Sequence, residues 1–204
     1  MSEDSPRLYL ATPPLADARA FQPALQEALN AGEIASLLIR FANDDDARGQ
    51  EDIVRELAPL AQEKGVAVLV EGEPNVALRA GADGAHIRGC GDALVEAAKK
   101  LSPRYIVGAG DLPTRDDAMR AGEIGVDYVL FDLQDRDALL ERVAWWAELF
   151  NTVSVARAAS LDEIAPLAAA GAEFVMLDDA IWHDARGPGA AVSDALKKLQ
   201  EAQV

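Results

Sequence analysis

Glycine joints divide this sequence into repeating helix–strand units, and the repeat restricts the fold more than any other feature. The four joints are Gly32-Glu33, Gly81-Ala82-Asp83, Gly125-Val126-Asp127 and Gly171-Ala172-Glu173. Each follows an alanine-rich stretch and precedes a short apolar run, as a glycine does when it ends a helix and turns the chain back. No linker or low-complexity segment separates the units, so the repeat predicts one domain of alternating helices and strands.

Short β-branched or leucine-rich runs supply the strands of this domain. We expect strands at Leu8–Ala11, Ala35–Phe41, Ala67–Val70, Gly84–Ile87, Tyr105–Gly108, Tyr128–Phe131, Val153–Val155 and Phe174–Leu177. This is the number that a closed (β/α)₈ barrel needs. Because no glycine-rich dinucleotide fingerprint follows the first run, we favour this TIM barrel, spanning residues 1–204, over an open doubly wound sheet.

The stretches between the runs have helical periodicity. Ile53 and Leu57 share one helical face, which predicts packing against the outside of the sheet. Pro59 and Pro166 lie inside two of these stretches and should kink or shorten the helices.

Composition excludes several partners. Of 204 residues 50% are hydrophobic, and 19 Lys and Arg against 35 Asp and Glu give a net charge of −16. Nucleic acid and anionic membranes require a basic surface, so neither is an expected partner. One cysteine, Cys90, excludes an internal disulfide. The acidic start and the shortness of the apolar runs predict a cytoplasmic protein.

One segment is similar to a known family. Residues 75–87 read Asn-Val-Ala-Leu-Arg-Ala-Gly-Ala-Asp-Gly-Ala-His-Ile, and they follow Leu8-Tyr9-Leu10-Ala11-Thr12 and Leu38-Ile39-Arg40. Together with the later Gly-Val-Asp and Gly-Ala-Glu joints, this resembles the thiamine-phosphate synthase and TenI family. The resemblance implies a (β/α)₈ barrel that joins a hydroxymethylpyrimidine diphosphate to a thiazole phosphate, with magnesium holding the departing pyrophosphate.

The positions that the resemblance assigns to magnesium and phosphate differ in this chain. Glu71 and Gly72 stand where the family has an Asn-Asp pair, and Arg88 begins a loop without a carboxylate. Arg157-Ala158 replaces a phosphate-binding Gly-Gly, and Asp178-Asp179 replaces a serine. Magnesium is therefore expected only if synthase chemistry is retained, and the usual metal and pyrophosphate site is expected to be lost. The TenI histidine would fall near Pro113.

Functional groups of such barrels gather where the strands end. The surviving family positions make Arg40, Glu71 and His86 the candidate catalytic residues. The candidate ligand-binding residues are Thr12, Arg88, Asp132, Arg157 and Asp179. The arginines could converge on an anionic small molecule or could pair with neighbouring aspartates, and both interpretations stay open.

Metal binding and nucleophilic catalysis are weaker hypotheses. Asp132, Asp178 and Asp179 with His86 or His183 offer oxygen and imidazole ligands, although only one of two adjacent aspartates can face inward on a strand. Cys90 could act as a nucleophile with His86 as its base, but an inert thiol is the simpler interpretation.

We interpret the sequence as a divergent family member that binds a small anionic or phosphorylated molecule at the barrel mouth. An active thiamine-phosphate synthase is one alternative. A non-catalytic interaction scaffold is the other, and a homodimer also stays open.

Overall fold

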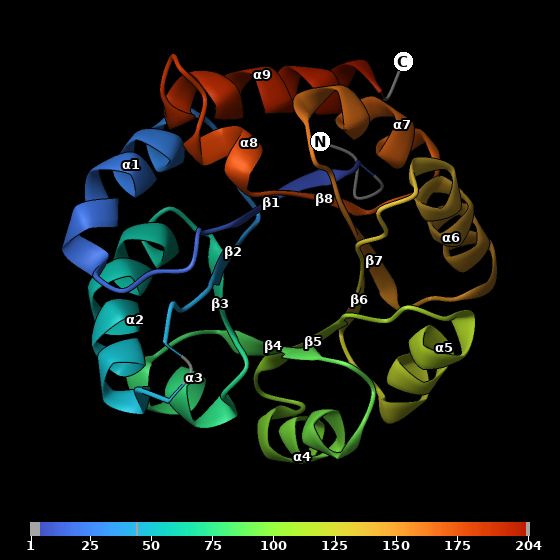
Figure 1. The fold of residues 1–204 in the computed structure, drawn as a ribbon, viewed down its shortest axis with the longest axis horizontal. Coiled ribbons are helices and arrows are strands. Elements are labelled where there is room, and N and C mark those ends of the chain that lie inside the picture. Colours follow the sequence, from blue (N-terminus) through green and yellow to red (C-terminus); the bar gives the residue numbers. More distant parts are fainter. Residues whose placement is uncertain (1–4, 44, 203–204) are drawn as a thin grey trace.

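A computed structural model of the chain describes residues 5–43 and 45–202 and confirms the predicted barrel. In the described residues the strands are β1 (Arg7–Ala11), β2 (Ser36–Ile39), β3 (Ala67–Glu71), β4 (Gly84–Arg88), β5 (Ile106–Gly110), β6 (Tyr128–Phe131), β7 (Val153–Arg157) and β8 (Phe174–Leu177). Each pairs in parallel with the next, and β8 pairs with β1, which closes the barrel (Figure 1).

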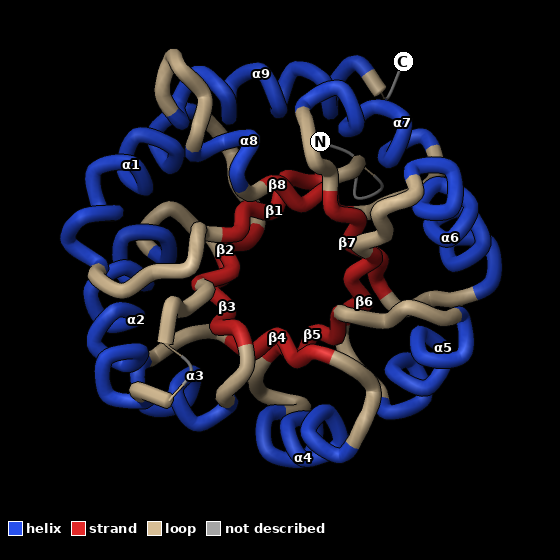
Figure 2. The backbone as a smooth tube through the Cα atoms, viewed as in Figure 1, coloured by secondary structure: helices blue, strands red, loops and turns tan. Residues whose placement is uncertain are grey.

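Helices cover the outside of the barrel as one ring (Figure 2). They are α1 (Ala18–Ala31), α2 (Ala47–Gln62), α3 (Pro74–Ala80), α4 (Asp92–Leu101), α5 (Arg115–Ile124), α6 (Arg136–Leu149), the 3₁₀ turn η1 (Leu161–Glu163), α7 (Ile164–Ala169), α8 (Asp179–Trp182) and α9 (Pro188–Glu201). No helix among the described residues is long and apolar enough to cross a membrane.

Two strands match their predicted bounds and six differ, with the second and fifth strands differing at both ends. The predicted Ala35–Phe41 strand is shorter, and Phe41 instead forms an isolated bridge with Leu15. The predicted Tyr105–Gly108 strand is shifted toward Gly110 and spans Ile106–Gly110. The prediction that Pro59 and Pro166 kink or shorten their helices holds for one of the two. The helix α2 continues past Pro59 to Gln62, whereas α7, which contains Pro166, has only six residues.

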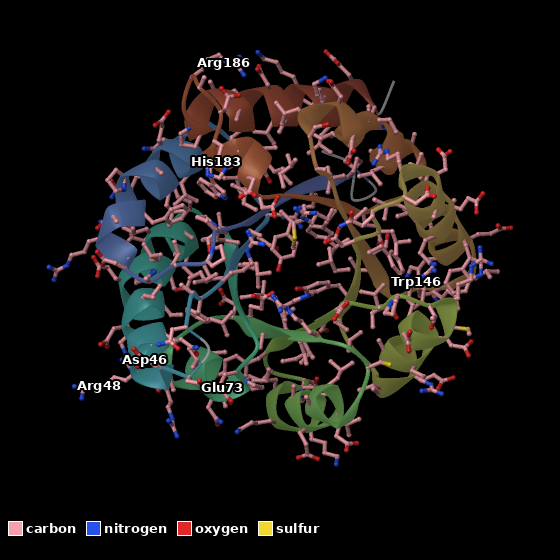
Figure 3. All side chains as sticks on the ribbon, in the orientation of Figure 1. Asp46, Arg48, Glu73, Trp146, His183 and Arg186 are labelled. Atoms are coloured by element: carbon pink, nitrogen blue, oxygen red, sulfur yellow. The ribbon has the colours of Figure 1, made fainter. Side chains whose placement is uncertain are left out.

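The strands separate two apolar layers. One layer lies between the strands and the ring of helices, where Trp146 is fully buried (Figure 3). Trp146 stacks on Phe150 with 4.1 Å between ring centroids. The other fills the barrel interior, and its buried members are Tyr9, Ala11, Leu38, Leu69, Tyr128, Leu130, Val155 and Met176. Because side chains alternate along a strand, the residues that follow this interior set by two positions also point inward.

All four glycine joints follow a helix and precede a strand, as predicted, and three of them have a left-handed backbone. Gly81 and Gly125 end α3 and α5 with φ near +82° and +87°, and Gly171 has φ +100°. Gly32 also ends its helix, α1, but its φ of 163° is extended. A Cβ at Gly32 would lie 2.2 Å from Leu196 Cδ1, so glycine there makes room for α9.

The start of α5 gives a measurable prediction. Thr114 Oγ1 accepts a hydrogen bond from the Asp117 N–H at 3.1 Å, and the Asp117 carboxylate accepts one from the Thr114 N–H at the same distance, forming a capping box. Thr114→Ala should lower the free energy of unfolding by about 1 kcal/mol in urea denaturation. Ser160 precedes η1 without a side-chain cap bond, so Ser160→Ala should change stability little, and equal losses in both variants would refute the assignment.

Candidate functional site

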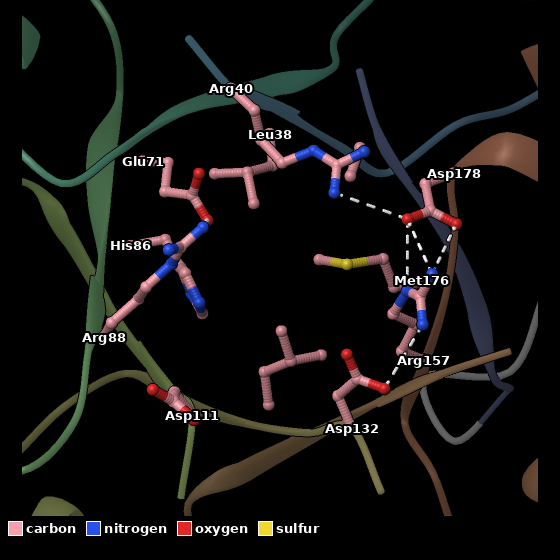
Figure 4. A pocket seen from close by; sticks show the side chains of 12 residues that line it. Leu38, Arg40, Glu71, His86, Arg88, Asp111, Asp132, Arg157, Met176 and Asp178 are labelled. Atoms are coloured by element: carbon pink, nitrogen blue, oxygen red, sulfur yellow. Dashed lines mark hydrogen bonds and ion pairs between the residues drawn. The ribbon is translucent and has the colours of Figure 1, made fainter. Parts of the chain in front are cut away.

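A polar pocket of about 410 Å³ opens where the strands end, at the carboxyl-terminal mouth of the barrel (Figure 4). Its floor and lower walls are apolar, and its rim is charged. The lining residues are Ala11, Leu38, Arg40, Glu71, His86, Arg88, Asp111, Leu130, Asp132, Arg157, Met176 and Asp178. Three arginines and four carboxylates thus face one cavity.

Strand alternation explains why these side chains meet. Leu38 lies in the interior layer, and Arg40 follows it by two residues. The same step leads from Leu69 to Glu71, and from Met176 to Asp178. Each strand therefore places an apolar side chain inside the barrel and a charged one at its mouth.

Two arginines converge on Asp178, which is 3% exposed. Arg157 donates from Nε and Nη2 to this carboxylate at 3.0–3.2 Å, and its Nη1 donates to Asp132 at 3.3 Å. Nη1 of Arg40 lies 3.4 Å from Asp178 Oδ2. Partial burial opposes the charge of Arg157, but the two carboxylates outweigh it and raise the pKa of the guanidinium above its ordinary value. Both guanidiniums are consequently held in place.

Thr12 acts on Arg40 from the end of β1. The Thr12 hydroxyl accepts the Arg40 N–H at 3.0 Å, and the Thr12 carbonyl accepts Nε of the guanidinium at 2.5 Å. Thr12 is fully buried and does not line the pocket. Thr12 therefore lies behind Arg40 and orients its side chain. It does not lie where it could contact a ligand in the pocket.

Glu71 and Arg88 form a second pair on the opposite side of the pocket (Figure 4). Both Nε and Nη2 of Arg88 donate to Glu71 Oε1, at 3.2 and 3.0 Å. Their strands are neighbours, since Glu71 pairs in register with His86, two residues before Arg88. The Glu71 carboxylate is therefore already engaged by a cation.

His86 lies beneath this pair and is buried. Its Nδ1 is 2.8 Å from the hydroxyl of Tyr128, which is 3.0 Å from the hydroxyl of Tyr9. Burial, with a smaller contribution from the Arg88 charge, lowers the pKa of His86 from 6.5 to about 4. Burial also raises the pKa of both tyrosines, so all three groups are uncharged near pH 7.

Most of the predicted residues meet in the pocket, but Asp179 does not. Asp179 is the first residue of α8, and its exposed carboxylate lies 3.7 Å from His183 Nδ1. The inward aspartate is its neighbour Asp178, because β8 ends at Leu177 with Met176 facing inward. The sequence-based choice between the two aspartates was therefore wrong.

Asp111 is a lining residue that the sequence analysis did not select. It follows Gly110, at the end of β5, and has φ +54°. Aspartate tolerates this left-handed backbone better than most residues. The conformation interrupts strand alternation, and Asp111 reaches the mouth although it comes directly after an inward-facing position.

The donors present do not fit a magnesium ion at the family position. Magnesium binds carboxylate oxygens in octahedral geometry, whereas the Glu71 carboxylate is held by Arg88. The alternative metal ligands Asp132, Asp178 and Asp179 do not converge on one point, because Asp179 lies outside the pocket. Across residues 5–43 and 45–202, no three Asp, Glu, His or Cys side chains converge as a metal site.

Cys90 has a partner other than His86. Its thiol donates to Asp117 Oδ1 at 3.4 Å. Partial burial and this carboxylate raise the pKa of the thiol, which favours the protonated form. This arrangement agrees with an inert thiol and does not provide an activated nucleophile.

Comparisons with known proteins identify the family of this chain. The family model for thiamine monophosphate synthase matches residues 8–181. A thiamine-phosphate synthase of Rhodospirillum centenum is 36% identical over 200 residues, covering 92% of this chain and 95% of that protein. One of Hyphomonas neptunium is also 36% identical over 200 residues, covering 91% and 90%.

A solved structure has the same fold. It is a thiamine phosphate pyrophosphorylase from Pyrococcus furiosus, with a TM-score of 0.83, 21% identity and 99% coverage of both chains. At that identity it supports the barrel alone, while the family model and the two relatives carry the assignment. The chain belongs to the thiamine monophosphate synthase family.

Proposed function

We propose that the mouth pocket binds a small phosphorylated molecule through Arg40 and Arg157, without the magnesium and pyrophosphate site that is usual in the family. The observation that carries this proposal is the convergence of both guanidiniums on the buried Asp178.

The charges on this side of the pocket balance, with two guanidiniums against Asp178 and Asp132, so the anion site rests on a guanidinium donor that these pairs leave free. Two guanidiniums share one buried carboxylate, and the second carboxylate, Asp132, is half-exposed and contacts only Nη1 of Arg157. Nη2 of Arg40 is not used by the contacts to Thr12 and Asp178. Guanidinium donors held in a fixed orientation suit phosphate oxygens, because little conformational freedom is lost on binding.

Family membership supports the class of ligand. The relatives are named for thiamine phosphate, and the resemblance assigns phosphorylated substrates to this face of the barrel. The departures at Glu71, Arg88 and Arg157 support a different means of holding the phosphate. A site that has lost the family's metal chemistry but still binds an anion accounts both for the family membership and for these departures.

Arg40→Ala tests the proposal. Thermal shifts are measured with pyrophosphate and thiamine phosphate, each with and without magnesium, since a ligand of the native state raises its stability. We expect a shift with the wild type and about tenfold weaker binding in Arg40→Ala, because a charge-assisted hydrogen bond is lost. Arg55→Ala removes an exposed guanidinium on α2, paired with Glu51 and Asp52, and should bind as the wild type does.

Two other results would redirect the proposal. Equal binding by Arg40→Ala and wild type would remove Arg40 from the site. Absence of a shift with every compound would instead leave the barrel as an interaction scaffold, and the search would turn to protein partners, including a second copy of the chain.

Synthase activity is the second candidate function, favoured by the 36% identity to two proteins named thiamine-phosphate synthase. Expression in a thiamine auxotroph that lacks its synthase separates it from binding alone. Growth without added thiamine supports synthase activity, whereas failure to grow with a correctly folded, phosphate-binding protein supports the binding function.

A further inference from the structure

Three buried polar side chains form a continuous chain beneath the mouth pocket. Tyr9 comes from β1, Tyr128 from β6 and His86 from β4, and their polar atoms are 3.0 and 2.8 Å apart. Gly108 of β5 leaves the space that this needs, since a Cβ there would lie 2.0 Å from Tyr128 Cζ. The chain is thus built into the interior layer of the barrel.

The number of available protons determines the direction in which the hydrogen bonds between Tyr9, Tyr128 and His86 are donated. Each phenol carries one proton, and a neutral imidazole carries one on either Nδ1 or Nε2. If Tyr9 donates to Tyr128 and Tyr128 donates to His86 Nδ1, both phenol protons are used. In the reverse direction the chain ends at Tyr9 with a buried O–H for which the described residues show no acceptor. Because an unsatisfied buried donor costs free energy, the first direction is favoured.

The favoured direction leaves the ring proton of His86 on Nε2. This atom lies beside Gly110, where a Cβ would be 2.5 Å away, and His86 lines the mouth pocket. Within the described residues no hydrogen-bond partner engages Nε2. The lining of the same pocket includes the apolar side chains Leu38, Leu130 and Met176. The N–H is therefore available to a ligand.

We propose that Tyr128 is a positioning residue that fixes His86 as its neutral Nε2–H tautomer, which gives the pocket an uncharged hydrogen-bond donor below the charged rim. The ligand should accordingly carry an acceptor atom, such as a carbonyl oxygen or an unprotonated ring nitrogen, on its less polar part. This second step rests on the proposed function, whereas the tautomer is a property of the ligand-free protein.

Nitrogen-15 NMR of the His86 ring in the ligand-free protein at pH 7 tests the tautomer. We expect one form, protonated at Nε2, in the wild type and in Tyr9→Phe, where Tyr128 still donates. In Tyr128→Phe both tautomers should be populated, because nothing holds Nδ1. His183, the second histidine, is exposed and serves as the internal reference. A wild-type ring protonated at Nδ1, a switch in Tyr9→Phe, or an unchanged spectrum in Tyr128→Phe would overturn the proposal.

Titration with thiamine phosphate tests the use of the donor. Tyr128→Phe should bind it about twofold more weakly than the wild type, because the ligand must then select the Nε2–H form from a mixture of tautomers. Equal affinity in the two proteins would reject the role in binding. If the wild type does not bind thiamine phosphate at all, the proposed function fails, and the NMR result still decides the tautomer.

Discussion

Asp178→Ala is expected to lower the free energy of unfolding by about 3 kcal/mol, measured by urea denaturation at pH 7. The substitution removes the carboxylate on which Arg40 and Arg157 converge and leaves two guanidiniums without that counter-charge. Breaking a fully buried ion pair lowers the free energy of unfolding by more than this. Here the arginine side chains are 22% and 30% exposed, so water partly compensates their charges once Asp178 is removed.

The neighbouring aspartate provides a matched control. Asp179 is exposed and begins α8, so Asp179→Ala should change stability by no more than about 0.5 kcal/mol. Asp178→Asn keeps the shape and acceptor oxygen but not the charge, and an intermediate loss is expected. Similar losses in Asp178→Ala and Asp179→Ala would show that the arginines do not depend on Asp178.

Stability should also fall as the pH is lowered from 6.5 toward 4, and His86 should account for about 3 kcal/mol of the fall. Burial lowers the pKa of His86 to about 4, so the unfolded chain takes up a proton at a pH where the folded chain does not. Above pH 6.5 neither state binds this proton, and below pH 4 both do. The contribution of His86 is therefore confined to the interval between them.

Other groups also titrate in this pH interval. The contribution of His86 is therefore obtained by comparing the wild type with histidine variants. The pH dependence of the unfolding free energy is compared for the wild type, His86→Gln and His183→Gln. His86→Gln should flatten the profile between pH 4 and 6.5. His183→Gln, which changes an exposed ring, should keep the slope of the wild type. An equal slope in His86→Gln would contradict the neutral, buried state of His86.

The fold could be predicted from sequence because its signals are local and repeated. Apolar runs such as Tyr128–Phe131 and Phe174–Leu177 agree with the observed strands to the residue. The glycine joints mark the returns to the sheet at Gly81 and Gly125. Gly32 also ends a helix, but the approach of Leu196 from α9, which leaves no room for a side chain there, is a contact distant in the sequence that no local pattern shows.

The site could be predicted only in part. Arg40 and Glu71 were found through the family resemblance, and Arg157 because it lies near a strand end. The choice of Asp179 over Asp178 ignored the alternation that starts from Met176. Counting two residues from the inward Met176 would have selected Asp178. Asp111 could not be found in this way, because its positive φ breaks the alternation.

The sequence could not predict which carboxylate each arginine of the pocket pairs with. The sequence left open whether the arginines meet a ligand or neighbouring aspartates. The structure shows Arg157 on Asp178 and Asp132, and Arg88 on Glu71. These contacts depend on strand register and burial, which bring together residues up to 25 positions apart. The chain of Tyr9, Tyr128 and His86 depends on register in the same way.

The most direct test of the anion site is a calorimetric titration of thiamine phosphate into the protein, with a chelator present to remove divalent ions. The proposed function predicts saturable binding at one site per chain, weakened about tenfold by Arg40→Ala and unchanged by Arg55→Ala. Binding that appears only when magnesium is restored would contradict the account, because it would require a metal site that Glu71, held by Arg88, does not supply.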